Sequence, residues 1–160
     1  MKAYKKIIVY YFTGTGNSFN VARWISEQAA ILHIECQLNR IADIGLQKDP
    51  APDAEALLVF VSPIHGFNYP PIMLRFLSLF PKGKNDIVLM NTRAGMLLGK
   101  FITPGLTGGA FYFASFLLFL KGYSLKALCA VDLPSNWMSL HPSLNDKTIL
   151  YLHQKNKEKV

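Results

Sequence analysis

The chain contains very little cysteine. Cys36 and Cys129 are the two cysteines among 160 residues, and they stand far apart in no paired motif. A disulfide scaffold, a cysteine-rich zinc module and a cysteine-ligated iron–sulfur cluster are therefore excluded within this chain.

Long hydrophobic runs are also missing. The most apolar segment, Ala110 to Leu120, ends at Lys121, whereas a membrane-spanning helix needs about 20 apolar residues. We favour a buried helix here, with a membrane-surface contact as the alternative. The N-terminal run Ile7 to Phe12 is too short for a signal peptide and is followed by glycines. We therefore expect a strand there, no transmembrane segment, and a cytoplasmic protein.

Acidic residues are scarce. The chain has 17 Lys and Arg but only 10 Asp and Glu, which gives a net charge of +7. Residues 81–160 carry ten basic and four acidic side chains, against seven and six in residues 1–80. The excess suits either a solvated helix and terminus or an acidic partner, protein or anionic surface. No RNP-type motif and no helix-turn-helix pattern is present, so nucleic acid is not an expected partner.

Strand and helix patterns alternate along the chain. At 51% hydrophobic residues, the length fits a single globular domain over residues 1–160. Apolar runs predict strands at 7–12, 33–41, 56–61, 86–90 and 125–133. Helical spacing predicts helices at 18–32, from Pro71 onward, at 110–120 and at 146–159. The prediction is an α/β fold, a doubly wound parallel sheet of five strands with helices on both faces.

In such a sheet, ligands bind beyond the carboxyl ends of the strands. The loops at 13–18, 62–70, 91–96 and 134–145 are therefore the candidates. The loop Thr13-Gly14-Thr15-Gly16-Asn17-Ser18 offers hydroxyl groups, flexible glycines and a helix N-terminus, without Lys or Arg. It is neither a Walker loop nor a G-x-G-x-x-G loop. These features predict a phosphate site of neutral donors; the alternative is a tight turn with a serine cap.

The same loop resembles the phosphate loop of the flavodoxins, [ST]-x-T-G-x-[ST], at every fixed position. The resemblance covers nearly the whole chain and implies the flavodoxin-like strand order 2-1-3-4-5. It also implies FMN as the cofactor, with its phosphate at Thr13, Gly14, Thr15, Gly16, Asn17 and Ser18. The chain looks most like the flavodoxin half of flavodoxin–ferredoxin fusion proteins, where TGTGNS and Ser-Pro-x-(His/Tyr) segments are common.

The resemblance implies two further loops beside the flavin ring. The first contains Pro63, Ile64, His65, Gly66 and Phe67, and the second contains Asn91, Thr92, Arg93, Ala94 and Gly95. In the first loop we expect His65, Phe67 and Tyr69 to offer flat side chains to the ligand, and Gly66 to allow a positive φ. The alternative is a surface turn whose aromatic rings pack inward.

The second loop departs from the family. It lacks the tyrosine that often stacks on the flavin, so Met96 or Trp137 is the candidate to cover that side of the ring. Arg93 would place a cation where the family is acidic; the alternative is a surface ion pair. A similar Pro-Ser-Asn segment occurs in the fusion proteins, and this resemblance implies that Ser135-Asn136-Trp137-Met138 lies near the edge of the cofactor; the alternative is a surface loop with one packed tryptophan.

The leading functional hypothesis is an FMN-binding electron-transfer protein. It is more an electron carrier than a substrate-turning enzyme, because no acid–base pair, catalytic residue or metal ligand set is evident. The expected partner is a redox protein such as an acidic ferredoxin or a reductase. The alternatives are an FMN-dependent reductase of a quinone or other small acceptor, and a flavodoxin-fold interaction module without flavin.

Overall fold

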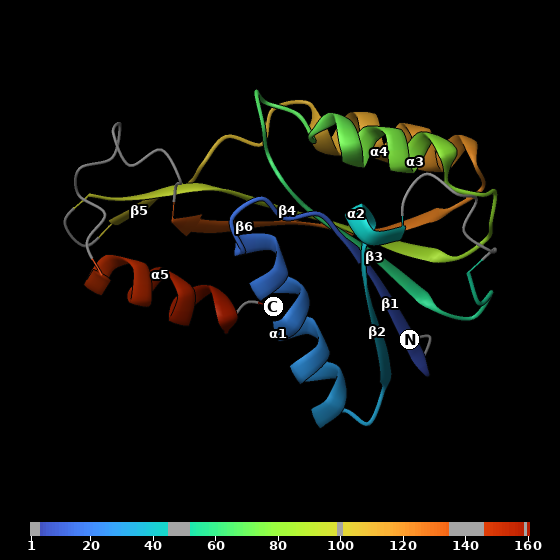
Figure 1. Ribbon diagram of the computed structural model, residues 1–160, viewed down its shortest axis with the longest axis horizontal. Helices are drawn as coiled ribbons and strands as arrows, with labels where there is room; N and C mark the ends of the chain where they lie inside the picture. Colours follow the sequence, from blue (N-terminus) through green and yellow to red (C-terminus); the bar gives the residue numbers. More distant parts are fainter. Residues whose placement is uncertain (1–3, 45–51, 99–100, 135–145, 159) are drawn as a thin grey trace.

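Five parallel strands form the central sheet (Figure 1). The computed structural model describes residues 4–44, 52–98, 101–134, 146–158 and 160. The strands lie side by side in the order β2-β1-β3-β4-β6, which is the predicted order 2-1-3-4-5 once a short extra strand, β5, is set aside. Their bounds are β1 (Lys6–Tyr11), β2 (Glu35–Arg40), β3 (Leu57–Pro63), β4 (Asp86–Leu98) and β6 (Ser124–Pro134).

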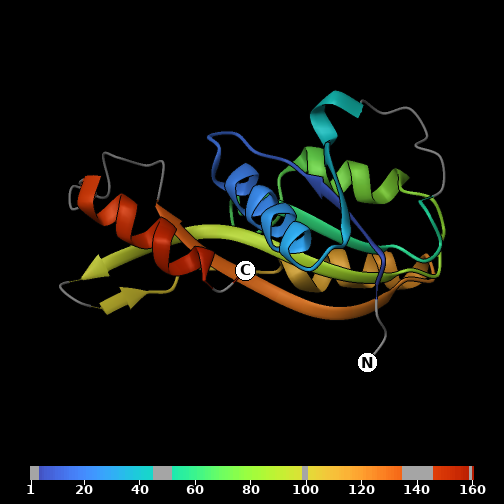
Figure 2. The ribbon, with the colours of Figure 1, turned by 90° about the horizontal axis from the view of Figure 1, so that it is seen from below.

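Helices cover both faces of the sheet (Figures 1 and 2). Helix α1 (Asn17–Ile31) and helix α5 (Asp146–Lys157) belong to one face. Helix α3 (Pro71–Leu79) and helix α4 (Ala110–Leu120) pack on the other, and the one-turn α2 (Ile41–Ile44) follows β2. The doubly wound architecture is confirmed.

Successive side chains of a strand point to opposite faces of the sheet, and helices cover both faces. Every residue in the continuous apolar runs of β1 and β3 can therefore be buried. Ile8 and Tyr10 face α3, whereas Val9 and Tyr11 face α1. The same alternation places Leu58 and Phe60 on one side of β3 and Val59 and Val61 on the other. Two hydrophobic cores therefore share one sheet, and the carboxyl ends of its strands meet along one edge.

The fourth strand is longer than the sequence predicted. We expected a strand over 86–90 followed by a loop, but β4 continues to Leu98 and turns back into β5 (Phe101–Thr103), with Met96 opposite Thr103. The prediction of a free second loop at 91–96 is therefore wrong. The reason is pairing: β6 accompanies β4 as far as Gly95 opposite Pro134, and this partner extends the strand.

Helix α4 has the predicted bounds, but it is buried on one side alone. Ala110, Ala114 and Leu118 are inaccessible to solvent, whereas Tyr112 and Phe119 are exposed. The expectation of a buried helix is thus correct for half of its surface. Among the described residues, no helix is both long and apolar enough to cross a bilayer.

Candidate functional site

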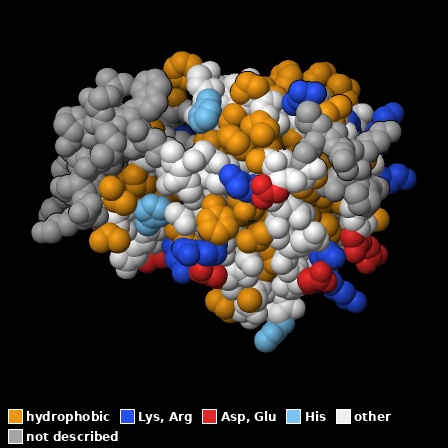
Figure 3. All heavy atoms as spheres, viewed as in Figure 1, with side chains coloured by type: hydrophobic (Ala, Val, Ile, Leu, Met, Phe, Trp, Pro, Cys, Tyr) orange, Lys and Arg blue, Asp and Glu red, His pale blue; other side chains and the backbone are white. Residues whose placement is uncertain are grey.

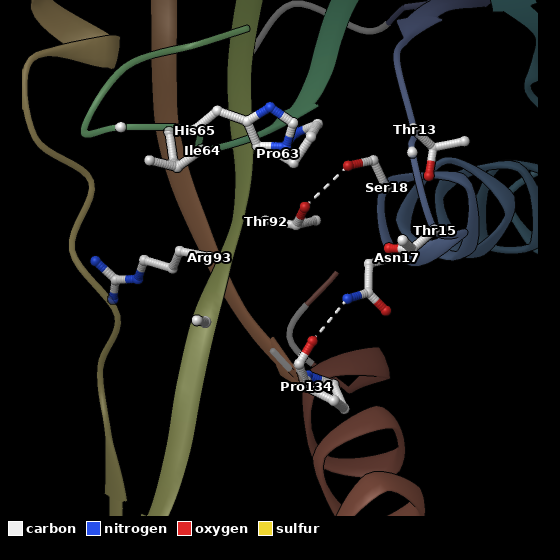
Figure 4. Close-up of a pocket in the computed structure, with 13 residues that line it drawn as sticks. Thr13, Thr15, Asn17, Ser18, Pro63, Ile64, His65, Thr92, Arg93 and Pro134 are labelled. Carbon is white, nitrogen blue, oxygen red and sulfur yellow. Dashed lines mark hydrogen bonds between the residues drawn. The ribbon is translucent and has the colours of Figure 1, made fainter. Parts of the chain in front are cut away.

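A cavity of about 580 Å³ opens at the carboxyl ends of the parallel strands (Figure 4). This is the position at which doubly wound sheets hold their ligands, and the volume is within the usual range for small-molecule sites. The lining comes from four separate segments: Thr13, Gly14, Thr15, Asn17, Ser18, Pro63, Ile64, His65, Gly66, Thr92, Arg93, Ala94 and Pro134.

The first segment joins β1 to the N-terminus of α1. Gly16 has a φ of 97°, the left-handed region that glycine adopts at low cost, and its N–H donates to Thr13 Oγ1 at 2.9 Å. No side chain caps α1, and its first turn contains no acidic residue. The positive end of the helix dipole therefore borders the cavity without a competing carboxylate, which suits an anion.

Two hydrogen bonds fix the start of α1 against other walls of the cavity (Figure 4). The Ser18 and Thr92 hydroxyls lie 2.9 Å apart and are buried, so they join α1 to β4. The amide of Asn17 donates to the carbonyl of Pro134 at 2.9 Å and joins α1 to the end of β6. Pro134 begins the candidate loop 134–145 but was not named as a site residue, because a backbone carbonyl leaves no signature in sequence.

The second segment is a tight turn after β3. His65 and Asn68 exchange backbone hydrogen bonds of 2.8 and 3.2 Å, and the two residues between them have φ of 56° at Gly66 and 64° at Phe67. Two successive positive φ values are typical of a type I′ turn. The expected positive φ at Gly66 is confirmed. A phenylalanine in this region is strained, and such strain clusters at functional sites.

Of the three flat side chains expected at this turn, His65 alone lines the cavity. Phe67 is exposed to solvent. The prediction for Tyr69 is wrong: its ring is buried edge-on against Phe111, and its hydroxyl donates to the Met90 carbonyl at 3.1 Å. Burial raises the pKa of Tyr69 well above its usual value. Its hydroxyl is therefore a neutral donor that ties the turn to β4.

Arg93 borders the cavity, but its guanidinium points away from it (Figure 4). Arg93 is paired with Asp132, its neighbour across β4 and β6, through hydrogen bonds of 2.8 and 3.1 Å. It also donates to Thr107 at 3.0 Å, while the Gly105 N–H donates to Asp132 at 2.8 Å. The expectation of a cation that acts on the ligand is therefore wrong, because the guanidinium is neutralised by Asp132 and directed away from the cavity. The alternative, an ion pair, is confirmed, although the pair is mostly buried.

The remaining predicted residues occupy different positions. Gly16, Phe67 and Asn91 are described but do not line the cavity. Asn91 is completely buried, and its amide oxygen and nitrogen have no hydrogen-bond partner in the described part of the chain. Gly95 lies within β4. The side chain of Met96 and the whole 135–138 segment, Trp137 included, lie outside the described residues.

The two ends of the cavity differ in their lining. One end has neutral hydrogen-bond donors, and the other is formed mainly by apolar and flat side chains. Hydroxyl and amide groups lie at Thr13 to Ser18, whereas Pro63, Ile64 and His65 line a different side of the cavity. No acidic residue lines the cavity in the part of the chain that the structure describes. No group of three metal-ligating side chains occurs there either. The arrangement suits a ligand with a phosphate and a flat ring.

Comparisons with known proteins identify the fold. No family model matches the chain, and no curated protein matches its sequence. Solved structures do match: a flavodoxin from the domain Archaea has a TM-score of 0.58 at 12% identity, with 96% of this chain and 94% of that chain covered. A short-chain flavodoxin associated with a bacterial microcompartment has a TM-score of 0.58 at 19% identity, again with 96% and 94% covered.

A third structure, a Fusobacterium nucleatum flavodoxin bound to flavin mononucleotide, has a TM-score of 0.57 at 12% identity, with 97% of this chain and 98% of that chain covered. At these identities the likeness concerns the backbone alone. The chain has the flavodoxin fold.

Proposed function

We propose that this protein binds FMN and transfers electrons. One observation carries the proposal: in a flavodoxin fold, an uncapped helix start with neutral hydroxyl donors opens into the same cavity as the Pro63–Gly66 wall. FMN, when bound, supplies the redox chemistry, and the protein binds it and sets its potential. No acid–base pair borders the cavity among the described residues, which favours an electron carrier over a substrate-turning enzyme.

The residues present fit the two parts of FMN. Thr13, Thr15 and the backbone at the start of α1 would hold the phosphate, because the helix dipole and neutral donors favour a dianion. Ser18 is already engaged with Thr92, so we assign it to holding the loop in place. The Pro63–Gly66 turn and the edge of β4 at Thr92 and Ala94 would contact the ring.

The proposal is tested by titrating the purified protein with FMN and with riboflavin, following flavin fluorescence and the visible absorption bands. FMN should bind far more tightly, since riboflavin lacks the phosphate. Thr15→Val removes a hydroxyl from the loop and should weaken FMN binding about 10- to 150-fold, the value of one hydrogen bond to a charged group. Thr15→Ser keeps the hydroxyl and should bind nearly as the parent protein does.

Equal affinity for FMN and riboflavin would contradict the phosphate site. A protein that remains colourless after incubation with FMN would indicate an interaction module without flavin. Turnover of a pyridine nucleotide with a quinone would favour the reductase alternative.

For the partner, we propose an acidic redox protein such as a ferredoxin or a reductase. The support is the net charge of +7, most of it in residues 81–160, which steers acidic molecules toward this protein. The TGTGNS loop and the Ser62-Pro63-Ile64-His65 segment also support a relationship to the flavodoxin half of flavodoxin–ferredoxin fusions. Association rates should fall as salt rises, because charges are screened beyond about 10 Å at 0.1 M salt. A rate independent of salt would contradict electrostatic steering.

A further inference from the structure

The outer face of α4 is covered with aromatic and aliphatic side chains. Two stripes run along this helix at helical spacing. Ala110, Ala114 and Leu118 form the inner stripe and are fully buried. The outer one, here called the aromatic stripe, consists of Tyr112, Phe113, Phe116, Phe119 and Leu120, with exposed fractions from 50% to 82%. A helix that is apolar all round is normally covered on both sides, so the aromatic stripe indicates a contact beyond this chain's own sheet.

The aromatic stripe is held rigidly in place. Lys121, the residue after α4, donates through Nζ to the carbonyls of Ser78 and Phe80 at 2.9 and 2.6 Å. These bonds tie the end of α4 to the end of α3. At the other end, the Gly109 N–H donates to the Phe67 carbonyl at 2.9 Å. The stripe is therefore a fixed surface of the folded domain.

The charges around the aromatic stripe have one sign. Helices α3 and α4 with the turns beside them, residues 71–85 and 104–123, contain four basic residues, Arg75, Lys82, Lys84 and Lys121, and no acidic residue. The neighbouring Asp86, at the start of β4, is bound by Lys126 at 3.1 Å and by the Tyr4 hydroxyl at 2.7 Å. Figure 3 shows hydrophobic and basic side chains, with no acidic one, along the upper edge, where α3 lies in front of α4.

Two of these basic residues lie next to the C-terminal end of α4. Lys82 and Lys84 are exposed and flank Gly83, whose N–H donates to the Lys121 carbonyl at 3.1 Å. Neither lysine makes an ion pair within the described ranges. The surface thus combines a rigid aromatic stripe with unpaired positive charge at one end.

Three kinds of partner could cover the aromatic stripe: a second copy of this chain, another protein, or an anionic lipid bilayer. The aromatic stripe and the positive charge beside it favour the bilayer. A second copy related by a two-fold axis would bring the same basic surroundings close to one another. A protein partner needs hydrogen bonds at about one per 100–200 Å² of interface, and the Tyr112 hydroxyl is the one side-chain polar group that the aromatic stripe offers. An anionic bilayer avoids both problems, because it carries negative charge and needs no array of side-chain hydrogen bonds. Aromatic side chains enter the boundary between headgroups and acyl chains, and lysines contact the lipid phosphates.

We propose that the aromatic stripe of α4, together with Lys82 and Lys84, docks this protein on the surface of an anionic lipid bilayer. The stripe enters the interfacial region with the helix parallel to the membrane plane, and the two lysines contact the headgroups. The proposal does not depend on flavin binding, because the stripe lies on the outer face of α4, outside the lining of the cavity.

The test is cosedimentation of the purified protein with vesicles of phosphatidylcholine alone and of phosphatidylcholine with phosphatidylglycerol. Binding should require the anionic lipid and weaken as salt rises. Replacing Phe116 and Phe119 together (Phe116→Gln, Phe119→Gln) should weaken binding at least 100-fold without a change in net charge, because two large apolar side chains no longer enter the bilayer. Lys82→Gln with Lys84→Gln should weaken it about 30-fold, since each lysine near such a surface contributes about a factor of five.

The control pair is Ile31→Gln with Leu32→Gln, two exposed apolar residues at the far end of α1, and it should bind vesicles as the parent protein does. Circular dichroism and urea unfolding verify that each variant is folded. Failure to bind anionic vesicles at low salt, or equal binding by the Phe116 and Phe119 variant, overturns the proposal. A parent dimer in light scattering that the same variant converts to a monomer also overturns it, because the stripe is then an interface between two copies.

Discussion

Helices α1 and α4 both lie against the central sheet, but their outer faces differ in kind. Outward from α1 point Arg23, Glu27 and Gln28, and Glu27 binds Lys157 of α5 at 2.7 Å. Outward from α4 point aromatic rings. Both helices therefore bury one side on the sheet in the same way. The outer face of α1 is polar and suits water, whereas the outer face of α4 is apolar and suits the bilayer surface proposed above.

The starts of the two helices differ as well. Both begin at a glycine without a side-chain cap. The start of α4 is covered by the chain itself, because Phe67 accepts a hydrogen bond from Gly109. The start of α1 borders the cavity. One helix end therefore serves packing, and the other is open to a ligand.

Substitution of Gly108 should give the largest effect on stability. Gly108 has a φ of 59°, and a Cβ there would collide with the backbone carbonyl of Phe67. Gly108→Ala should lower the free energy of unfolding by about 3 kcal/mol, the sum of left-handed strain and overpacking. The measurement is urea unfolding. If Gly108→Ala costs no more than the same change at the uncrowded Gly66, the contact between the turn and α4 is not tight.

Loss of the ion pair between Arg93 of β4 and Asp132 of β6 should have an effect of similar size. Asp132 accepts hydrogen bonds from both Arg93 and Gly105, so Asp132→Asn leaves a mostly buried guanidinium without its counter-ion. Such a loss costs about 3 kcal/mol. Arg40→Gln is the control, because the exposed Arg40–Asp43 pair should contribute less than about 1 kcal/mol. Equal losses would show that Arg93 is solvated rather than held by β6.

Gly66→Ala should have an intermediate effect. A Cβ at Gly66 meets no atom within 4 Å, but the φ of 56° is unfavourable for alanine. We expect a loss of about 1–2 kcal/mol in the free energy of unfolding. Gly14→Ala, at a glycine with open space and no positive φ, should change it by less than about 0.5 kcal/mol. A neutral Gly66→Ala would indicate that the turn relaxes to another conformation.

A pH dependence at the contact between α1 and α5 should be the smallest effect. Burial, and then the charge of Arg23, lower the pKa of His153 from its usual 6.5, and its ring packs edge-on against Trp24 at 5.8 Å. The unfolded chain binds a proton first as pH falls, so stability is full above about pH 6.5 and is lost below it. Urea midpoints at pH 7.5 and pH 5.5 measure the loss. His153→Gln should reduce the difference between the two midpoints, and an unchanged difference would assign it to other groups.

Local patterns in the sequence predicted much of the fold. The continuous apolar runs of β1 and β3 and the stripe of α1 indicate elements whose burial depends on residue type and period alone. The bounds of α4 are those that its composition predicted. The loop at 13–18 was recognisable as a candidate phosphate site because hydroxyl residues and glycines must be adjacent in sequence to form one.

Partners distant in sequence decided the rest. The sequence around Arg93 does not indicate that Asp132 is its partner. The pairing of β4 with β6 extends β4, neutralises Arg93 and brings Pro134 to the cavity. Tyr69 turned inward because the Met90 carbonyl offered its hydroxyl a buried acceptor. The sequence by itself determined that α4 is apolar all round. The tertiary structure decided which half of the helix the sheet covers, because a single sheet face buries one side of a helix and leaves the other exposed.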